Sequence, residues 1–97
     1  MHGYQQTAAR PPQWNPSGDS LQTLVLQMVQ QLVDMPGEAG VSATEGQHTV
    51  IIKVWVAPTD VGKVIGKKGR IADALRTIVS AAGAKQGKRA LLEISEE

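Results

Sequence analysis

Four consecutive residues, Gly66-Lys67-Lys68-Gly69, have types and spacing that point to binding chemistry. Glycine has no Cβ, so Gly66 and Gly69 permit a tight turn that another backbone can approach closely. The two lysines place positive charge at that point, and a helix beginning at about Arg70 directs its free N–H groups to the same place. The pattern therefore predicts a clamp for a phosphodiester backbone.

This segment has two other interpretations. A nucleotide-binding P-loop needs four residues between its glycines and then Lys followed by Ser or Thr. Only three residues separate Gly62 from Gly66, and Lys68 follows Lys67, so the P-loop is excluded. A plain turn between two helices remains as the alternative, but it does not explain why both intervening residues are lysine.

The distribution of charge favours a basic face although the net charge is only +1. Nine of the ten Lys and Arg residues lie within 53–89, where only Asp60 and Asp73 oppose them. The rest of the chain is acidic. Such an asymmetry is typical of a protein that presents one basic surface to a polyanion.

The first element expected is an amphipathic helix that Asp19 or Ser20 caps and that Met35-Pro36-Gly37 ends. Apolar residues recur along it at helical spacing. The stripe predicted to face the core is Leu21, Leu24, Val25, Met28, Leu32 and Val33.

The clearest strand spans 48–56, where side chains alternate between two faces. The face expected to pack under the helices carries Val50, Ile52, Val54 and Val56. Ile51 and Trp55 then lie on the open face of the sheet, where an exposed indole can mark a self-association or partner surface. Shielding of this face by the N-terminal arm is the alternative, and the sequence leaves both open.

The remaining elements surround the loop. Strands are expected at 41–45 and 89–94, with a short helix at 60–65 that Thr59 caps. The helix after the loop has the apolar stripe Ile71, Ala74, Leu75, Ile78, Val79 and Ala82. The order is helix, strand, strand, helix, helix, strand. These periodicities indicate an α+β domain with one sheet and helices on one side.

Residues 60–84, DVGKVIGKKGRIADALRTIVSAAGA, resemble the KH core of the small single-domain bacterial RNA-binding proteins of the KhpA type. The strand and turn at 54–58 and the N-terminal helix also fit, so the resemblance covers about residues 20–94. It implies an α+β fold of the type II KH class, in which three helices cover one face of a three-stranded sheet. A KH domain is therefore expected at 20–97.

The binding hypothesis gives each residue near the loop a role. The N–H groups of Gly66 to Gly69 and the side chains of Lys67 and Lys68 hold phosphates, and Lys63 and Arg70 extend the basic rim. Three apolar residues opposite the second strand wall a groove for unstacked bases: Val64, Ile65 and Ile71. The resemblance implies the same ligand, single-stranded RNA. Single-stranded DNA remains open, because a backbone clamp without 2′-hydroxyl contacts accepts either.

One KH fold contacts only about four nucleotides, so useful affinity requires a second copy. The resemblance implies a homodimer, or pairing with a second KH-containing protein of the Jag type, and a role as RNA chaperone or post-transcriptional regulator. The competing hypothesis is a protein-interaction module that uses the sheet face around Ile51 and Trp55, with RNA binding incidental.

Several classes of function lack support. The absence of cysteine excludes disulfides, thiolate metal sites and a cysteine nucleophile. His2 and His48 have no partners at metal-ligand spacing, so no cofactor and no enzymatic activity are expected. No apolar run reaches the roughly 18 residues of a membrane span, and no signal peptide is evident, so we expect a cytoplasmic protein. Residues 1–19 are expected to form a disordered arm outside the resemblance, and whether it covers or extends the groove is left open.

Overall fold

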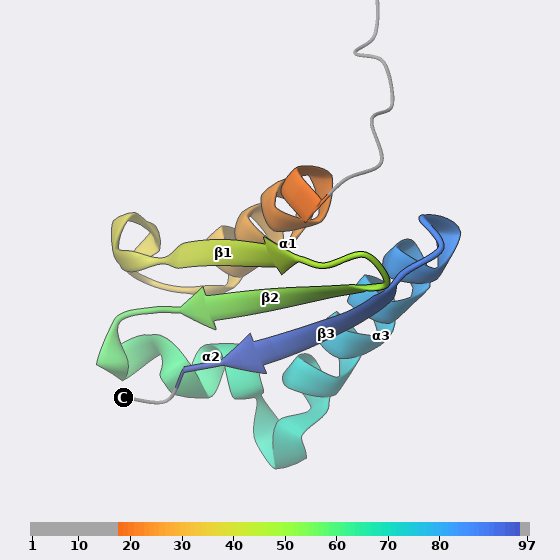
Figure 1. The fold of residues 1–97 in the computed structure, drawn as a ribbon. Helices are drawn as coiled ribbons and strands as arrows, with labels where there is room; N and C mark the ends of the chain where they lie inside the picture. The colour runs from red at the N-terminus through yellow and green to blue at the C-terminus, as the bar shows by residue number, and fades with distance from the viewer. Residues whose placement is uncertain (1–17, 96–97) are drawn as a thin grey trace, which may run out of the picture.

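The computed structural model describes residues 18–95 as an α+β domain with one three-stranded sheet (Figure 1). The helices are α1 (Gly18–Leu32), α2 (Val61–Ile65) and α3 (Arg70–Lys85), and the strands are β1 (Gly40–Glu45), β2 (Thr49–Trp55) and β3 (Arg89–Ile94). Short 3-10 turns lie at Pro36–Glu38, Pro58–Asp60 and Lys67–Gly69. The predicted fold class and the order of helices and strands are confirmed.

The sheet is mixed, in the order β1-β2-β3. β1 and β2 form an antiparallel hairpin, closed by a hydrogen bond from the N–H of Gly46 to the carbonyl oxygen of Thr49 (2.7 Å). β3 pairs parallel to β2, so the chain must cross over between these two strands. That crossover contains α2, the glycine loop and α3, and the parallel pairing therefore fixes where the loop lies.

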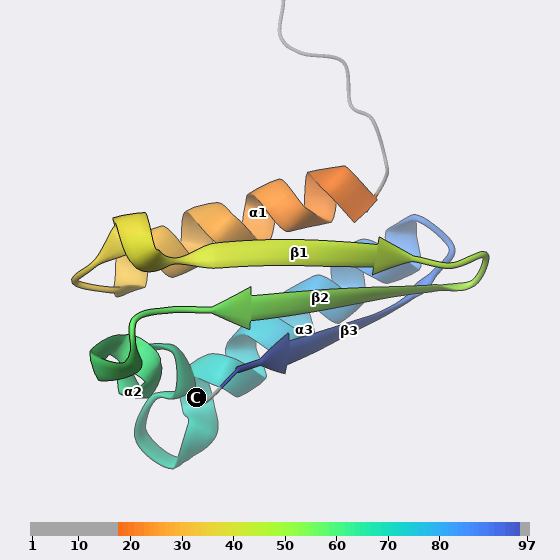
Figure 2. The same cartoon turned by 60° about the vertical axis from the view of Figure 1, so that its left-hand side comes forward.

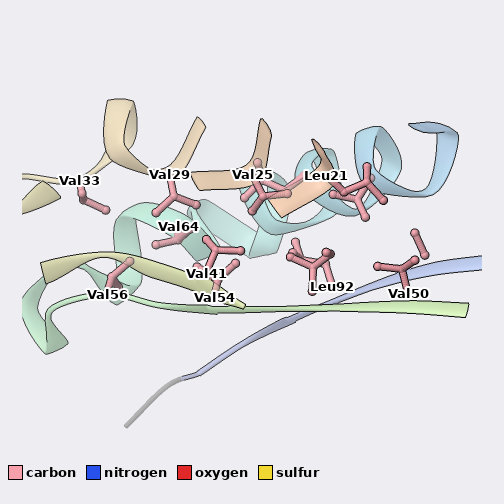
Figure 3. Packing of buried hydrophobic residues seen from close by; sticks show 14 residues of the cluster. Leu21, Val25, Val29, Val33, Val41, Val50, Val54, Val56, Val64 and Leu92 are labelled. Atoms are coloured by element: carbon pink, nitrogen blue, oxygen red, sulfur yellow. The ribbon is translucent and has the colours of Figure 1, made fainter. Parts of the chain in front are cut away.

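The core lies between one face of the sheet and the long helices. α1 runs along β1, while α3 runs behind β3, on the same side of the sheet (Figures 1 and 2). Along β2, Val50, Ile52 and Val54 point into this layer and are fully buried. The two predicted faces of this strand are confirmed. Figure 3 shows how side chains from the helices meet those of the strands.

The predicted helix stripes were partly wrong. In α3 the buried residues are Ala72, Leu75, Val79 and Gly83. Ala74 is exposed, and Ile78 is 45% exposed. Adjacent residues on a helix point about 100° apart, so the row through Ala74 and Ile78 turns away from the sheet when the row through Leu75 and Val79 faces it. In α1 the buried row is Leu21, Val25 and Val29, which Val33 continues just after the helix, and Leu32 is 37% exposed.

Two predicted helix caps were also wrong. α1 begins at Gly18, so Asp19 and Ser20 lie inside its first turn and do not precede it. Thr59 lies within the 3-10 turn before α2, and no side chain caps α2. The predicted disordered arm falls almost wholly on residues 1–17, which lie outside the described part of the chain.

Candidate functional site

The Gly66–Gly69 loop joins α2 to α3 through an unusual backbone path. Gly66 has φ 79° and ψ 171°, a region open only to glycine, and its missing Cβ would lie 2.6 Å from Cγ1 of Ile71. Lys68 and Gly69 both adopt the left-handed region, with φ 57° and 74°. A left-handed lysine is uncommon and strained, so the loop holds its second lysine in a conformation that the surrounding turn imposes.

The N–H groups of the loop are used in two different ways. Gly66 donates to the carbonyl oxygen of Gly62 (2.8 Å), and Gly69 donates to that of Gly66 (3.0 Å). Gly66 breaks the helical path, and the N–H groups of Lys67 and Lys68 are not among the donors in these loop hydrogen bonds. The prediction that all four N–H groups are available was therefore wrong for both glycines. The glycines shape the loop, and the two lysine N–H groups remain as donors.

Three cationic side chains surround these donors. Lys67, Lys68 and Arg70 are exposed, and among the hydrogen bonds and ion pairs of the described residues none involves their side chains. Their charge is therefore not compensated by a neighbouring carboxylate. Backbone donors beside unpaired cations form a site complementary to an anion such as a phosphate.

Lys63 has a different environment from the one predicted for it. Its Nζ lies 3.3 Å from Oδ2 of Asp34 and 3.9 Å from Oδ1 of Asp60. The side chain turns from the loop toward the end of α1, and two carboxylates offset its charge. This pairing with Asp34 could not be predicted from the sequence, because the two residues are far apart along the chain.

The apolar residues assigned to a base groove also need correction. Val64 is fully buried in the core, so it cannot wall a surface groove. Ile65 is half-buried. Ile71 contacts the loop at Gly66 and then lines an open hollow between α1 and α3. For Ile71 the expected position opposite the second strand was wrong, because α3 lies over β3 (Figures 1 and 2).

Two of the surface hollows beside α3 bear on the site. The hollow between α1 and α3, of about 450 Å³, is almost entirely apolar, and its lining residues are Met28, Gln31, Leu32, Arg70, Ile71, Ala74 and Leu75. The groove between α3 and β3, of about 360 Å³, is lined by Arg76, Ser80, Arg89, Ala90, Leu91 and Leu92. The sequence did not reveal the second groove, since its residues come from two segments that meet only through the parallel crossover.

The sheet face opposite the helices carries Ile51 and Trp55, as predicted. Trp55 is 46% exposed, and Ile51 is half-buried. The indole ring lies against Gly40 of β1, so closely that a Cβ at Gly40 would overlap it. Part of the indole surface is therefore covered by the protein's own strand, which reduces the apolar area left for a partner.

Neither a metal site nor a membrane-spanning helix is found in the described part of the chain. Within residues 18–95, no three His, Cys, Asp or Glu side chains come together as metal ligands. No helix in the same range has the length and apolarity to cross a membrane.

Comparison with known proteins matches residues 22–94 to the family model of the KhpA/KhpB KH domain. The chain belongs to this family. The match spans every strand and helix described here, apart from the first turn of α1, and it contains the whole Gly66–Gly69 loop. The α+β fold follows the KH arrangement in its element order and sheet.

Curated relatives of this family cover most of the chain. The RNA-binding protein KhpA of Aquifex aeolicus is 49% identical over 77 residues, which are 79% of this chain and 98% of the relative. The protein of the same name from Clostridium acetobutylicum is 46% identical over 74 residues, 76% of this chain and 99% of the relative. That of Listeria monocytogenes is 42% identical over 76 residues, 78% of this chain and all of the relative. No solved structure matches the chain.

Proposed function

We propose that this protein binds single-stranded RNA by holding its phosphate backbone at the Gly66–Gly69 loop. The observation that carries the proposal is the pair of N–H donors at Lys67 and Lys68, two residues whose side chains are exposed and cationic. The names of the curated relatives, RNA-binding protein KhpA, support the same ligand. Arg70, at the start of α3, adds a third unpaired cation on the rim.

A strand held at the loop needs a surface for its bases. We assign this role to the groove between α3 and β3, where Arg76 and Arg89 are the cations. Arg76 pairs with Asp73 in the free protein (3.4 Å), and both side chains are well exposed, so the pair is weak and can give way to a phosphate. Few aromatic residues are present, and we therefore expect little discrimination among base sequences.

Fluorescence anisotropy with a short labelled RNA tests the proposal directly. We expect binding that weakens as salt increases, with a log-log slope of roughly 0.7 for each phosphate neutralised. A DNA strand of the same sequence shows whether 2′-hydroxyl groups contribute. Binding that fails even at low salt would contradict the proposed function, and equal binding of DNA would extend the ligand class to both nucleic acids.

Lys63 provides a control within the basic segment. Because its charge is offset by Asp34 and Asp60, Lys63→Gln is expected to change RNA affinity by less than about twofold and to leave the salt slope nearly unchanged. Lys67→Gln is expected to lower the slope by roughly 0.7. Anisotropy titrations at several salt concentrations measure both values. Equal effects of the two substitutions would show that Lys63 contacts RNA after all.

The cellular role that fits these properties is that of a cytoplasmic RNA chaperone or post-transcriptional regulator without catalytic activity. One KH domain contacts only about four nucleotides, so weak binding by a single copy is expected. A second copy, or a second KH-containing protein of the Jag type, would raise the affinity by linking two sites.

The apolar hollow between α1 and α3 is the surface we favour for pairing with a second copy. Leu32 and Ile78 are exposed on this side of the molecule, at 37% and 45%. Met28 and Ile71 line the hollow itself. A two-fold symmetric pair would place the same hollow of each copy against the other and remove these side chains from water. The sheet face is the competing surface, where Trp55 is 46% and Leu91 39% exposed.

Two substitutions that introduce a carboxylate show which of these two surfaces forms the dimer. If two copies pair through the apolar hollow between α1 and α3, Ile78→Glu is expected to convert a dimer into a monomer. Trp55→Glu is expected to leave the dimer intact. Sedimentation equilibrium over a range of protein concentrations measures the change. The opposite result, with dissociation caused only by Trp55→Glu, would make the sheet face around Ile51 and Trp55 the pairing surface. It would then favour the competing protein-interaction hypothesis if the monomer still bound RNA as tightly.

A further inference from the structure

Among the side chains that the structure describes, Asp60 is the one polar or charged group buried to the level of the core, with 1% of its surface exposed. A carboxylate in such a place is costly unless hydrogen bonds compensate for the lost water. The phosphate clamp proposed above does not include this residue, so its burial requires a separate explanation.

Both carboxylate oxygens of Asp60 accept hydrogen bonds from a distant part of the backbone. Oδ1 accepts from the N–H of Asp34 (3.1 Å), and Oδ2 accepts from the N–H of Met35 (2.9 Å). These two N–H groups belong to the segment that leaves α1, which ends at Leu32. Asp60 immediately precedes α2. The contact, which we name the Asp60 junction, therefore joins the end of α1 to the start of α2.

The junction lies just before the loop that holds the two free N–H donors. α2 has only five residues, Val61–Ile65, and the next residue is Gly66. So short a helix has little stability of its own and depends on tertiary contacts for its direction. These contacts include Val64, fully buried in the core, the exposed ion pair of Lys63 with Asp34, and the Asp60 junction. The direction of α2 in turn sets where Gly66–Gly69 lies.

We propose that Asp60 is a positioning residue for RNA binding, which acts by fixing α2 and hence the N–H groups of Lys67 and Lys68. The inference rests on the proposed function of the loop. Asp60 contacts no RNA itself, since its carboxylate is buried and occupied by the backbone of Asp34 and Met35. Nearby Lys63 places its ammonium 3.9 Å from Oδ1 and partly offsets the buried charge.

Asp60→Asn tests the junction with little change in volume. An amide has only one acceptor oxygen, and its NH₂ group would face one of the two backbone N–H groups, so at least one hydrogen bond is lost. We expect RNA affinity to fall about fivefold to tenfold. The salt slope should stay at the wild-type value, because no phosphate contact is removed. Asp34→Asn is the matched control: it keeps the backbone N–H and removes only an exposed ion pair with Lys63, so affinity should change less than about twofold.

A second comparison separates positioning from loss of stability. Val50 is fully buried at the hairpin end of β2, and Val50→Ala destabilises the core at a site that does not contact the junction. The RNA affinity and the hydrogen exchange of all variants are measured at a temperature at which circular dichroism shows them folded. Hydrogen exchange of the Gly66 and Gly69 amides, both hydrogen-bonded in the loop, is expected to accelerate in Asp60→Asn and not in Val50→Ala.

Each outcome bears on a different claim. Wild-type affinity in Asp60→Asn, or an equal loss in Val50→Ala, would overturn the positioning role. Faster exchange at Gly66 and Gly69 together with lower affinity supports it. If the wild-type protein binds no RNA, the proposed function fails, and hydrogen exchange alone still decides whether the junction fixes the loop.

Discussion

Reversal of both loop charges, in Lys67→Asp/Lys68→Asp, is expected to lower RNA affinity by about 100-fold or more without unfolding the protein. Each lysine–phosphate contact is a charge-assisted hydrogen bond worth about 1.5–3 kcal/mol, and two are lost. The new carboxylates also repel the phosphates. Both side chains are exposed and make no ion pair within the described residues, so the fold loses no contact. Anisotropy titration measures the affinity, and circular dichroism checks the fold.

The control for this variant changes the same amount of charge elsewhere. Lys53 lies on the open face of the sheet and Lys85 at the end of α3, both outside the loop. Lys53→Glu/Lys85→Glu is expected to weaken binding by only a few-fold, through the long-range field alone. Should both double variants lose affinity equally, net charge rather than the loop would account for binding.

Gly66→Ala is expected to have the second large effect, on both the stability of the protein and its affinity for RNA. A Cβ at this position would lie 2.6 Å from Cγ1 and 2.9 Å from the backbone nitrogen of Ile71, and φ 79° with ψ 171° is a region that alanine avoids. We expect a loss of about 2–3 kcal/mol in the free energy of unfolding, or a displaced loop, and about a tenfold fall in RNA affinity. Urea denaturation and anisotropy measure the two quantities.

Gly69 is the comparison position for this test, because both its ψ (15°, against 171° at Gly66) and its surroundings differ from those of Gly66. It has φ 74°, and nothing lies within 4 Å of a Cβ built there. Asparagine tolerates this left-handed conformation, so Gly69→Asn is expected to cost less than about 1 kcal/mol and to retain most of the affinity. A larger loss in Gly69→Asn than in Gly66→Ala would mean that the second glycine, and not the first, is the one that the loop geometry requires.

The sequence predicted the fold and the place of the loop because both depend on local signals. Alternation along β2 separates Val50 and Ile52 from Ile51 and Trp55 without knowledge of any partner. The two glycines around Lys67 and Lys68 are adjacent in the chain, so their spacing alone marks a tight turn. The periodicities indicated only one sheet with helices on one side, and the family resemblance added that three helices cover one face of a three-stranded sheet.

What the sequence could not predict depends on contacts between distant segments. Lys63 was expected on the basic rim. Instead it forms an ion pair with Asp34, which lies just after the end of α1. In a helix of five residues the periodicity is too short to decide which side faces inward, and Val64 proved to be core. The six-residue stripe of α3 covers two adjacent rows, so only the packing against the sheet selects Val79 and leaves Ile78 exposed.

The most direct test of the central claim is an amide-resolved NMR titration of the ¹⁵N-labelled protein with a short single-stranded RNA. The predicted result is that the largest shifts occur at the N–H groups of Lys67 and Lys68 and at Arg70, with smaller ones along the groove between α3 and β3. Largest shifts at Ile51 and Trp55, with the loop amides unmoved, would contradict the claim and place the RNA on the open face of the sheet.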